Sequence, residues 1–150
     1  MIFDLDLVTE PGSERVFLNC ISRLPRSYGQ IRAIFDTGSP KTIISARDVF
    51  ALKIPVKNLE KAPPTKGFGR GGLPSKELNN FKFILKSKDS QIKEFEMPVY
   101  VIDIDSLTKL NDEYRKSAYS IPTIIGLDFL RLFNLKLYIN LKETYAFIEE

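Results

Sequence analysis

The sequence predicts a mostly β protein, one domain over residues 1–150, with one or two short helices. Three observations support this class. Hydrophobic residues make up 43% of the chain and charged residues 27%, close to ordinary globular usage. The apolar residues fall in short runs that alternate with polar ones, as in half-buried strands. Glycine or proline turns separate these runs, and 150 residues suffice to bury a core.

The first part of the chain is typical of strands joined by turns. Three runs are predicted to be strands, the first two separated by a Pro-Gly turn: Phe3–Val8, Arg15–Ser22 and Ile31–Phe35. Thr42–Ala46 is apolar and β-branched, which favours another strand. Ala46–Leu52 is predicted to form a short helix that ends before Pro55.

The middle of the chain has a different composition. Lys61–Pro74 holds three of the nine prolines and four of the eight glycines. Both residues interrupt helices, so this segment is predicted to be a loop or the tip of a hairpin. Two strands are predicted after it, Leu78–Lys86 and Gln91–Ile104.

The last third is predicted to mix helices and strands. Asp105–Ser117 is polar and predicted to be helical, with Asp105 or Ser106 as its N-cap. A strand, a short helix and a terminal hairpin are predicted to follow: Ile121–Ile125, Asp128–Phe133, and Leu135–Asn140 with Thr144–Ile148.

Composition excludes several classes of function. The chain has no histidine and one cysteine, Cys20, which excludes Ser-His-Asp and Cys-His catalysis and metal centres built from those residues. The net charge of +3 is weak and evenly spread, so no nucleic-acid partner is expected. No apolar run is long enough to span a bilayer, so no membrane partner is expected either. We expect no metal and no cofactor, and catalysis would rest on carboxylates, hydroxyls, amines or backbone groups.

The first ten residues carry three acidic side chains, where a secretion signal would be basic. We therefore expect a cytoplasmic protein.

The segment Gly67–Gly72 matches the G-x-G-x-x-G pattern of dinucleotide-binding proteins. That pattern needs a strand before it and a helix directly after it. Here Pro63 and Pro64 precede the glycines and Pro74 follows them, which argues against nucleotide binding. Two interpretations stay open: a flexible flap, for which glycine allows close backbone approach, and an ordinary surface loop.

The strongest local signal is Asp-Thr-Gly-Ser at Asp36–Ser39, which follows the apolar run Ile31–Phe35 directly. Taken alone, this Asp could cap a turn or a helix. Two further features stand in order behind it. They are the glycine-rich segment, about thirty residues on, and Ile124–Gly126 at the end of a second apolar run.

This ordered set resembles the aspartic proteases, and by length the retropepsin-like group. In that family an apolar strand leads into an Asp-Thr/Ser-Gly turn, a glycine-rich flap follows, and a hydrophobic-hydrophobic-Gly motif precedes a short helix. The resemblance implies a single-lobe closed β-barrel and an aspartic endopeptidase that cleaves extended polypeptide. The local sequence Phe-Asp-Thr-Gly-Ser is closer to the pepsin-like version, but pepsins carry two such turns in one chain and this chain carries one.

The chemistry that the resemblance implies needs two carboxylates facing each other over one water. Like charges that close share a proton, so one carboxylate acts as base while the protonated one polarises the scissile carbonyl. With a single Asp-Thr-Gly, the second Asp36 has to come from a second copy, and we expect a C2 homodimer. Terminal strands commonly form the dimer sheet in this family, which makes Phe3–Val8 and Thr144–Ile148 candidates here.

The resemblance also implies roles for the neighbouring residues. Asp36 would be catalytic, Thr37 would hydrogen-bond across the dimer axis, and Gly38 would let the substrate backbone approach, with Ser39 completing the loop. The other implied site residues belong to the flap and to the second motif, with Phe68 and Ile125 as pocket walls: Phe68, Gly69, Arg70 and Gly71; Ile124, Ile125 and Gly126.

The sequence departs from the family pattern beside the motifs. Many retroviral proteases have an Asp two residues after the motif Gly and an Arg directly after the second motif's Gly. Here these positions are Pro40 and Leu127, so the support of the active-site loop is expected to differ. Lys41 is unusual so close to the Asp, and we expect it to point to solvent.

Two other functions remain possible from the sequence. The first is a non-catalytic dimer of the same fold that only binds a peptide or a partner protein, because fold does not guarantee chemistry. The intact Asp-Thr-Gly argues against it. The second is an unrelated small β domain in which Asp36 caps a turn, and a protein that stays monomeric would favour this one.

Overall fold

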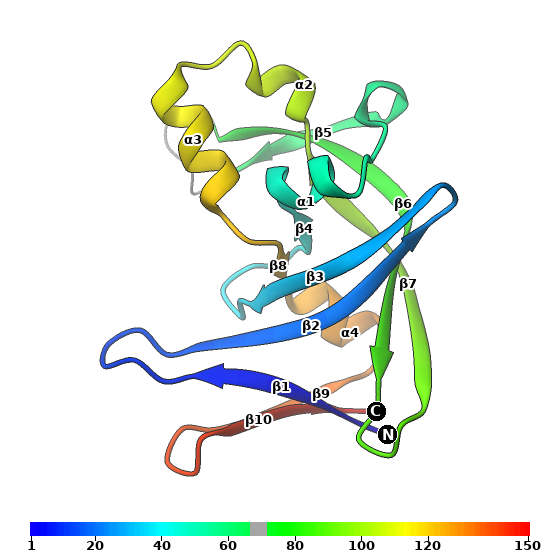
Figure 1. Cartoon of the computed structure of the whole chain (residues 1–150), viewed down its shortest axis with the longest axis vertical. Helices are drawn as coiled ribbons and strands as arrows, with labels where there is room; N and C mark the ends of the chain where they lie inside the picture. The colour runs from blue at the N-terminus through cyan, green and yellow to red at the C-terminus, as the bar shows by residue number, and fades with distance from the viewer. Residues whose placement is uncertain (67–71) are drawn as a thin grey trace.

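Figure 1 shows the computed structural model, which describes residues 1–66 and 72–150. The strands in these residues are β1 (Ile2–Val8), β2 (Arg15–Leu24), β3 (Ser27–Phe35), β4 (Ile43–Ile44), β5 (Glu60–Thr65), β6 (Leu73–Lys86), β7 (Ile92–Ile102), β8 (Ile124–Ile125), β9 (Lys136–Asn140) and β10 (Tyr145–Glu149). The α-helices are α1 (Ala46–Ala51), α2 (Ile104–Leu107), α3 (Asp112–Ser120) and α4 (Leu127–Leu132), and a 3-10 turn covers Val56–Asn58.

Six strands close into a barrel. They follow the order β6-β7-β4-β8-β3-β2, and antiparallel pairing of β2 with β6 joins the two ends. Three residue pairs make this closure, Ile21–Ile84, Ser22–Phe83 and Arg23–Lys82. The predicted mostly β class and closed barrel are therefore confirmed.

The barrel is filled by the inward side chains of alternating strand positions and by α4. Phe129 of α4 is fully buried and makes edge or tilted ring contacts with Phe35, Phe83 and Phe95 at centroid separations of 6.2, 5.6 and 5.4 Å. Ring pairs in this range add to the free energy gained by burial. The core thus fixes α4 directly beneath the end of β3.

The terminal strands form an outer sheet at one end of the molecule, opposite the end that carries α1, α2 and α3 (Figure 1). β1 pairs with β2 and with β10, and β10 also pairs with β9. Both sides of β10 are therefore occupied within one chain. Of the described strands, β9 and β5 are the two at the edges of the sheet order.

The β2–β3 hairpin is longer than predicted. Its pairing runs to Leu24–Ser27, because Pro25 and Arg26 form a two-residue turn rather than ending the strands early. The predicted strands at Thr42–Ala46 and Ile121–Ile125 are only two residues long. The first ends early because the Ser45 hydroxyl accepts a hydrogen bond from Asp48 N and so caps α1.

The region 105–117 is not one helix. α2 ends at Leu107, and α3 begins after Asn111, whose side chain accepts a hydrogen bond from Tyr114 N at 2.8 Å. The N-cap is therefore Asn111 and not Asp105 or Ser106. The described residues hold four short α-helices, more than the one or two expected.

The described ends of the proline-rich and glycine-rich segment Lys61–Pro74 belong to two antiparallel strands, and the loop or hairpin tip predicted for residues 67–71 lies outside the described residues. β5 contains Pro63 and Pro64 and pairs with the start of β6, with Thr65 opposite Leu73. Proline lacks a backbone donor, and an edge strand such as β5 tolerates that loss.

Candidate active site

The Asp-Thr-Gly turn and the Ile-Ile-Gly segment lie side by side. β3 pairs in parallel with β8, Ile34 opposite Ile124 and Phe35 opposite Ile125. The contact continues past the strand, because Asp36 N donates to the Ile125 carbonyl at 3.0 Å. The two motifs that the sequence singles out, separated by almost ninety residues, therefore meet at the end of one strand pair.

The turn itself is held by its own Asp. Oδ1 of Asp36 accepts a hydrogen bond from Gly38 N at 2.9 Å, and the Asp36 carbonyl accepts one from Ser39 N at 3.0 Å. The Asp36, Thr37 and Gly38 residues are exposed. A carboxylate oriented by a main-chain donor thus stands at the surface on a defined loop.

The loop is clamped from below by Gly126. Leu127 N donates to the Ser39 carbonyl at 2.9 Å, and Ser39 Oγ donates to the Lys41 carbonyl at 2.7 Å. A Cβ on Gly126 would lie 2.6 to 2.8 Å from the main-chain N, C and O of Lys41. Only glycine allows this approach.

A second clamp joins the loop to α4. Thr42 is fully buried, and its N and Oγ1 both donate to the Asp128 carboxylate, at 3.0 and 2.7 Å. Thr42 Oγ1 also accepts from Gly126 N at 3.1 Å. Sequence reasoning missed this pair, because a Thr and an Asp so far apart in the chain give no local signal. The absence of the retroviral-type Asp and Arg, at Pro40 and Leu127, predicts only that the support of the Asp36 loop differs from theirs.

Asp36 borders two clefts. One, of about 670 Å³, lies between the active-site loop and β5 and is lined by Asp36, Gly38, Ser39, Pro40, Lys41, Ile43, Pro63, Pro64, Thr65, Lys66, Tyr100 and Ile124. The other, of about 390 Å³, reaches from Asp36 and Thr37 to the β9–β10 hairpin, where Leu137, Ile139 and Leu141 line it.

The second-motif residues face in different directions. Ile124 lines the larger cleft, whereas Ile125 is fully buried in the barrel core. The expectation that Ile125 forms a pocket wall is therefore wrong, because consecutive strand residues point to opposite sides. The other predicted flap residues, Phe68, Gly69, Arg70 and Gly71, lie outside the described residues.

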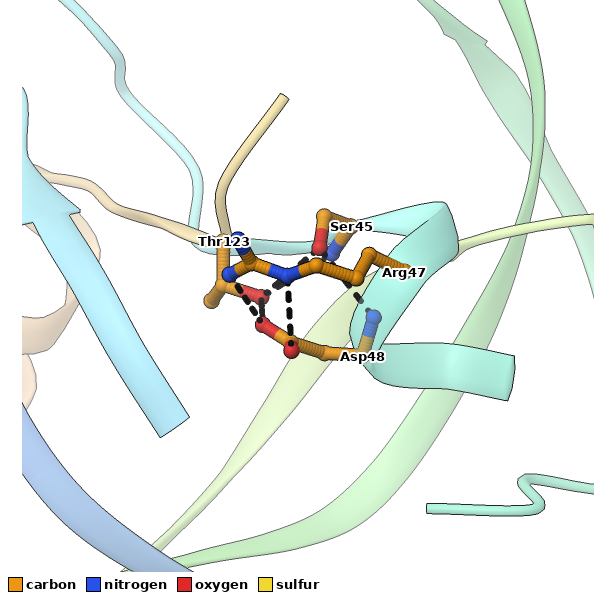
Figure 2. A network of polar contacts seen from close by, with 4 residues as sticks. All are labelled: Ser45, Arg47, Asp48 and Thr123. Atoms are coloured by element: carbon orange, nitrogen blue, oxygen red, sulfur yellow. Dashed lines mark hydrogen bonds and ion pairs between the residues drawn. The ribbon is translucent and has the colours of Figure 1, made fainter. Parts of the chain in front are cut away.

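A polar network ties the start of α1 to the residue before β8 (Figure 2). Asp48 accepts a hydrogen bond from Thr123 Oγ1 at 2.6 Å and forms an ion pair with Arg47 at 3.3 Å. Thr123 Oγ1 in turn accepts from Ser45 N at 3.0 Å. The network satisfies a nearly buried carboxylate and fixes the residue that precedes Ile124.

The described residues contain no group of three His, Cys, Asp or Glu side chains arranged to hold a metal ion. They also contain no helix with the length and apolar character that crossing a membrane requires.

Comparison with known proteins supports the fold. No known family pattern matches the sequence, and no curated protein matches it. Among solved structures, a retropepsin-like aspartic protease from Rickettsia conorii superposes with a TM-score of 0.57 at 13% identity, over 99% of this chain and 91% of that one. EIAV protease, solved with the inhibitor HBY-793, matches with a TM-score of 0.44 at 19% identity, over 88% of this chain and all of that one. The match to the Rickettsia structure confirms the resemblance that the motifs indicated at the level of the fold: this chain has the retropepsin-like fold.

Proposed function

We propose that the protein is an aspartic endopeptidase that hydrolyses peptide bonds of extended polypeptide. One observation carries the proposal. Asp36 presents an exposed carboxylate on a loop clamped at Ser39, Lys41 and Thr42, and it stands where two clefts meet. Catalytic carboxylates need such a fixed position beside a groove.

The proposed reaction uses two Asp36 carboxylates, one from each copy in a homodimer. The pair shares one proton and titrates as a unit. The ionised carboxylate takes a proton from water, whose oxygen attacks the peptide carbon, while the protonated carboxylate donates a hydrogen bond to the carbonyl oxygen. Collapse of the tetrahedral intermediate breaks the C–N bond as a proton passes to the leaving nitrogen. Thr37, exposed beside Asp36, would bond across the two-fold axis.

The surface beside Asp36 suits a second copy. The β9–β10 hairpin exposes four large side chains, with exposed fractions between 40 and 55%: Tyr138, Ile139, Leu141 and Tyr145. Ile139 and Leu141 also line the cleft that reaches Asp36. Exposed apolar groups of this kind mark interaction surfaces. We therefore propose that the edge strand β9 forms the main part of the dimer interface, because β10 already pairs with β1 and β9 on its two sides.

The β5–β6 hairpin would act as the flap. Its strand β5 lines the larger cleft with Pro63, Pro64 and Thr65. In this proposal Phe68, Gly69, Arg70 and Gly71 close over a substrate bound as an added β-strand, whose side chains fill alternate pockets. Residues 1–150 act as one domain, in line with a main core that runs from Phe3 to Ile148. The cytoplasmic location stays a prediction of the sequence.

The test compares three proteins on an unfolded substrate from mildly acid to neutral pH. The parent and Asp105→Asn, an exposed Asp on α2, should cleave it, and Asp36→Asn should not. Sedimentation velocity should find a dimer in all three. Equal cleavage by the parent and Asp36→Asn would refute the proposal. A dimer that binds peptide without cleaving it would instead support the non-catalytic binding function.

A further inference from the structure

The charge around the larger cleft is uneven. Of its twelve lining residues, Lys41 and Lys66 are basic, and Asp36 is the only acidic one. Both lysines are exposed, and neither forms an ion pair with any residue that the structure describes. Outside the carboxylate that would do the chemistry, the lining charge of this cleft is therefore positive.

The main chain of Lys41 is restrained more than its exposure suggests. Its carbonyl accepts from Ser39 Oγ, and its backbone packs against Gly126. The next residue, Thr42, is held by Asp128 and accepts a hydrogen bond from Tyr100 N at 3.1 Å. The starting point of the Lys41 side chain is thus fixed at the rim of the cleft.

The ammonium group of Lys41 also has a defined position, over an aromatic ring. Lys41 Nζ lies 5.7 Å from the centroid of the Tyr100 ring, within the range of a cation–π contact. Tyr100 is itself placed by pairing with Ile43 in the β4–β7 ladder. A pre-positioned cation loses less side-chain entropy when it binds an anion than a free one does.

A neighbouring pocket of about 430 Å³ shares Lys41 and Tyr100 with the cleft, and its two basic and two acidic lining residues balance. Its charged lining residues besides Lys41 are Glu77, Asp128 and Arg131. Asp128 already accepts from Thr42 N, Thr42 Oγ1 and Phe129 N. Glu77 and Arg131 carry opposite charges. The excess of positive charge is therefore confined to the larger cleft, beside Asp36.

We propose that Lys41, assisted by Lys66, makes the enzyme prefer substrates with an acidic side chain within about four residues of the scissile bond, the reach of a short extended segment. This inference rests on the proposed protease function, because it assigns a substrate class to the same cleft. Lys41 is a specificity residue here and takes no part in bond cleavage.

The experiment uses four pairs of peptides built on one cleaved sequence, each pair with Glu or Gln at one of the four positions nearest the cut on one side. For the parent, kcat/KM should favour Glu by about three- to fivefold in at least one pair at low salt, the size expected of exposed ion pairs. The preference should shrink in 0.5 M NaCl because salt screens it. Lys41→Gln should bring the ratio close to one, Lys41→Arg should keep it, and Lys88→Gln, an exposed lysine in the β6–β7 turn, should not alter it. Each variant is judged by its own ratio of kcat/KM for the Glu and Gln peptides. A change in its overall rate of cleavage therefore does not affect the comparison.

A binding measurement separates this inference from the proposed activity. Fluorescence anisotropy of the same labelled peptides on Asp36→Asn reports affinity without cleavage. Tighter binding of the Glu peptide, lost in Asp36→Asn with Lys41→Gln, supports the preference even if the parent cleaves nothing. Equal kcat/KM and equal affinity for Glu and Gln in all four pairs, or a ratio that survives Lys41→Gln, overturns it.

Discussion

Asp128 accepts two hydrogen bonds from Thr42, one from the main-chain nitrogen and one from Oγ1. The pair joins the end of the active-site loop to the first turn of α4, which Phe129 anchors in the barrel core. A partly buried carboxylate that accepts several donors holds its partners in one geometry. The position of Asp36 therefore depends on a contact made six residues further along the chain.

Replacing Thr42 with Val should test this tie. Val has the same shape but loses the bond to Asp128 and leaves Gly126 N without its acceptor. We expect the free energy of unfolding to fall by about 1–3 kcal/mol. Urea denaturation measures it. Thr108→Val, whose exposed hydroxyl bonds only the Asp105 carbonyl, should change it by less than about 0.5 kcal/mol. Equal losses in the two variants would argue against a special role for Thr42.

Gly126→Ala should displace the active-site loop. The new methyl group would meet the backbone of Lys41, which Ser39 and Thr42 hold in place, so relief requires moving the loop. We expect a loss of stability of about 1–3 kcal/mol and strongly reduced peptide cleavage. In Gly29→Ala the new methyl group meets only the end of the Leu52 side chain, at 2.9 Å, and this matched variant should be milder. If Gly126→Ala cleaves peptide at the parental rate, the loop is not clamped as described.

Ile139→Glu should weaken the dimer. Ile139 is 46% exposed on the edge strand β9 and lines the cleft that reaches Asp36. A charge buried there without a partner should raise the dimer dissociation constant at least about tenfold and lower cleavage in proportion at limiting concentration. Sedimentation equilibrium measures the constant. Ile92→Glu, at a position that is 65% exposed on β7, is the control and should dimerise normally. Parental association of Ile139→Glu would place the interface elsewhere.

The Cys20 thiol predicts how stability depends on pH. Burial, with a smaller contribution from the Asp48 charge, raises its pKa from 9.0 to about 12. Between these values the unfolded chain loses the proton while the folded chain keeps it, so the stability of the folded state falls as pH rises above 9. From pH 9 to 10.5 this group should cost about 2 kcal/mol.

The comparison with Cys20→Ala isolates this effect from the other groups that titrate in the same range. The variant should lose about 2 kcal/mol less than the parent over that interval. In the native parent, iodoacetamide should also react slowly with the thiol at pH 8, and quickly in urea. Parallel stability curves for the two proteins would contradict the raised pKa.

The sequence predicted the fold through features that are local. Alternation along β2 and the apolar run before Asp36 each reflect which side of one strand is buried, and a short window of sequence carries that information. It did not predict the split of α2 from α3, because the Asn111 cap lies inside an otherwise uniform polar segment. Nor did it indicate Thr42 and Asp128, whose partnership exists only after the barrel has closed.

The short β2–β6 contact has a consequence for how the protein folds and opens. It joins Ile21 to Ile84, so sixty-odd residues must be organised before three residue pairs can form. Closing so long a loop costs entropy that only the completed barrel repays, which makes barrel closure a late and cooperative event. Ser22 sits in this seam with its buried Oγ lacking a hydrogen-bond partner in the described part of the chain. The amides along this line are thus where native-state hydrogen exchange should first detect the barrel opening.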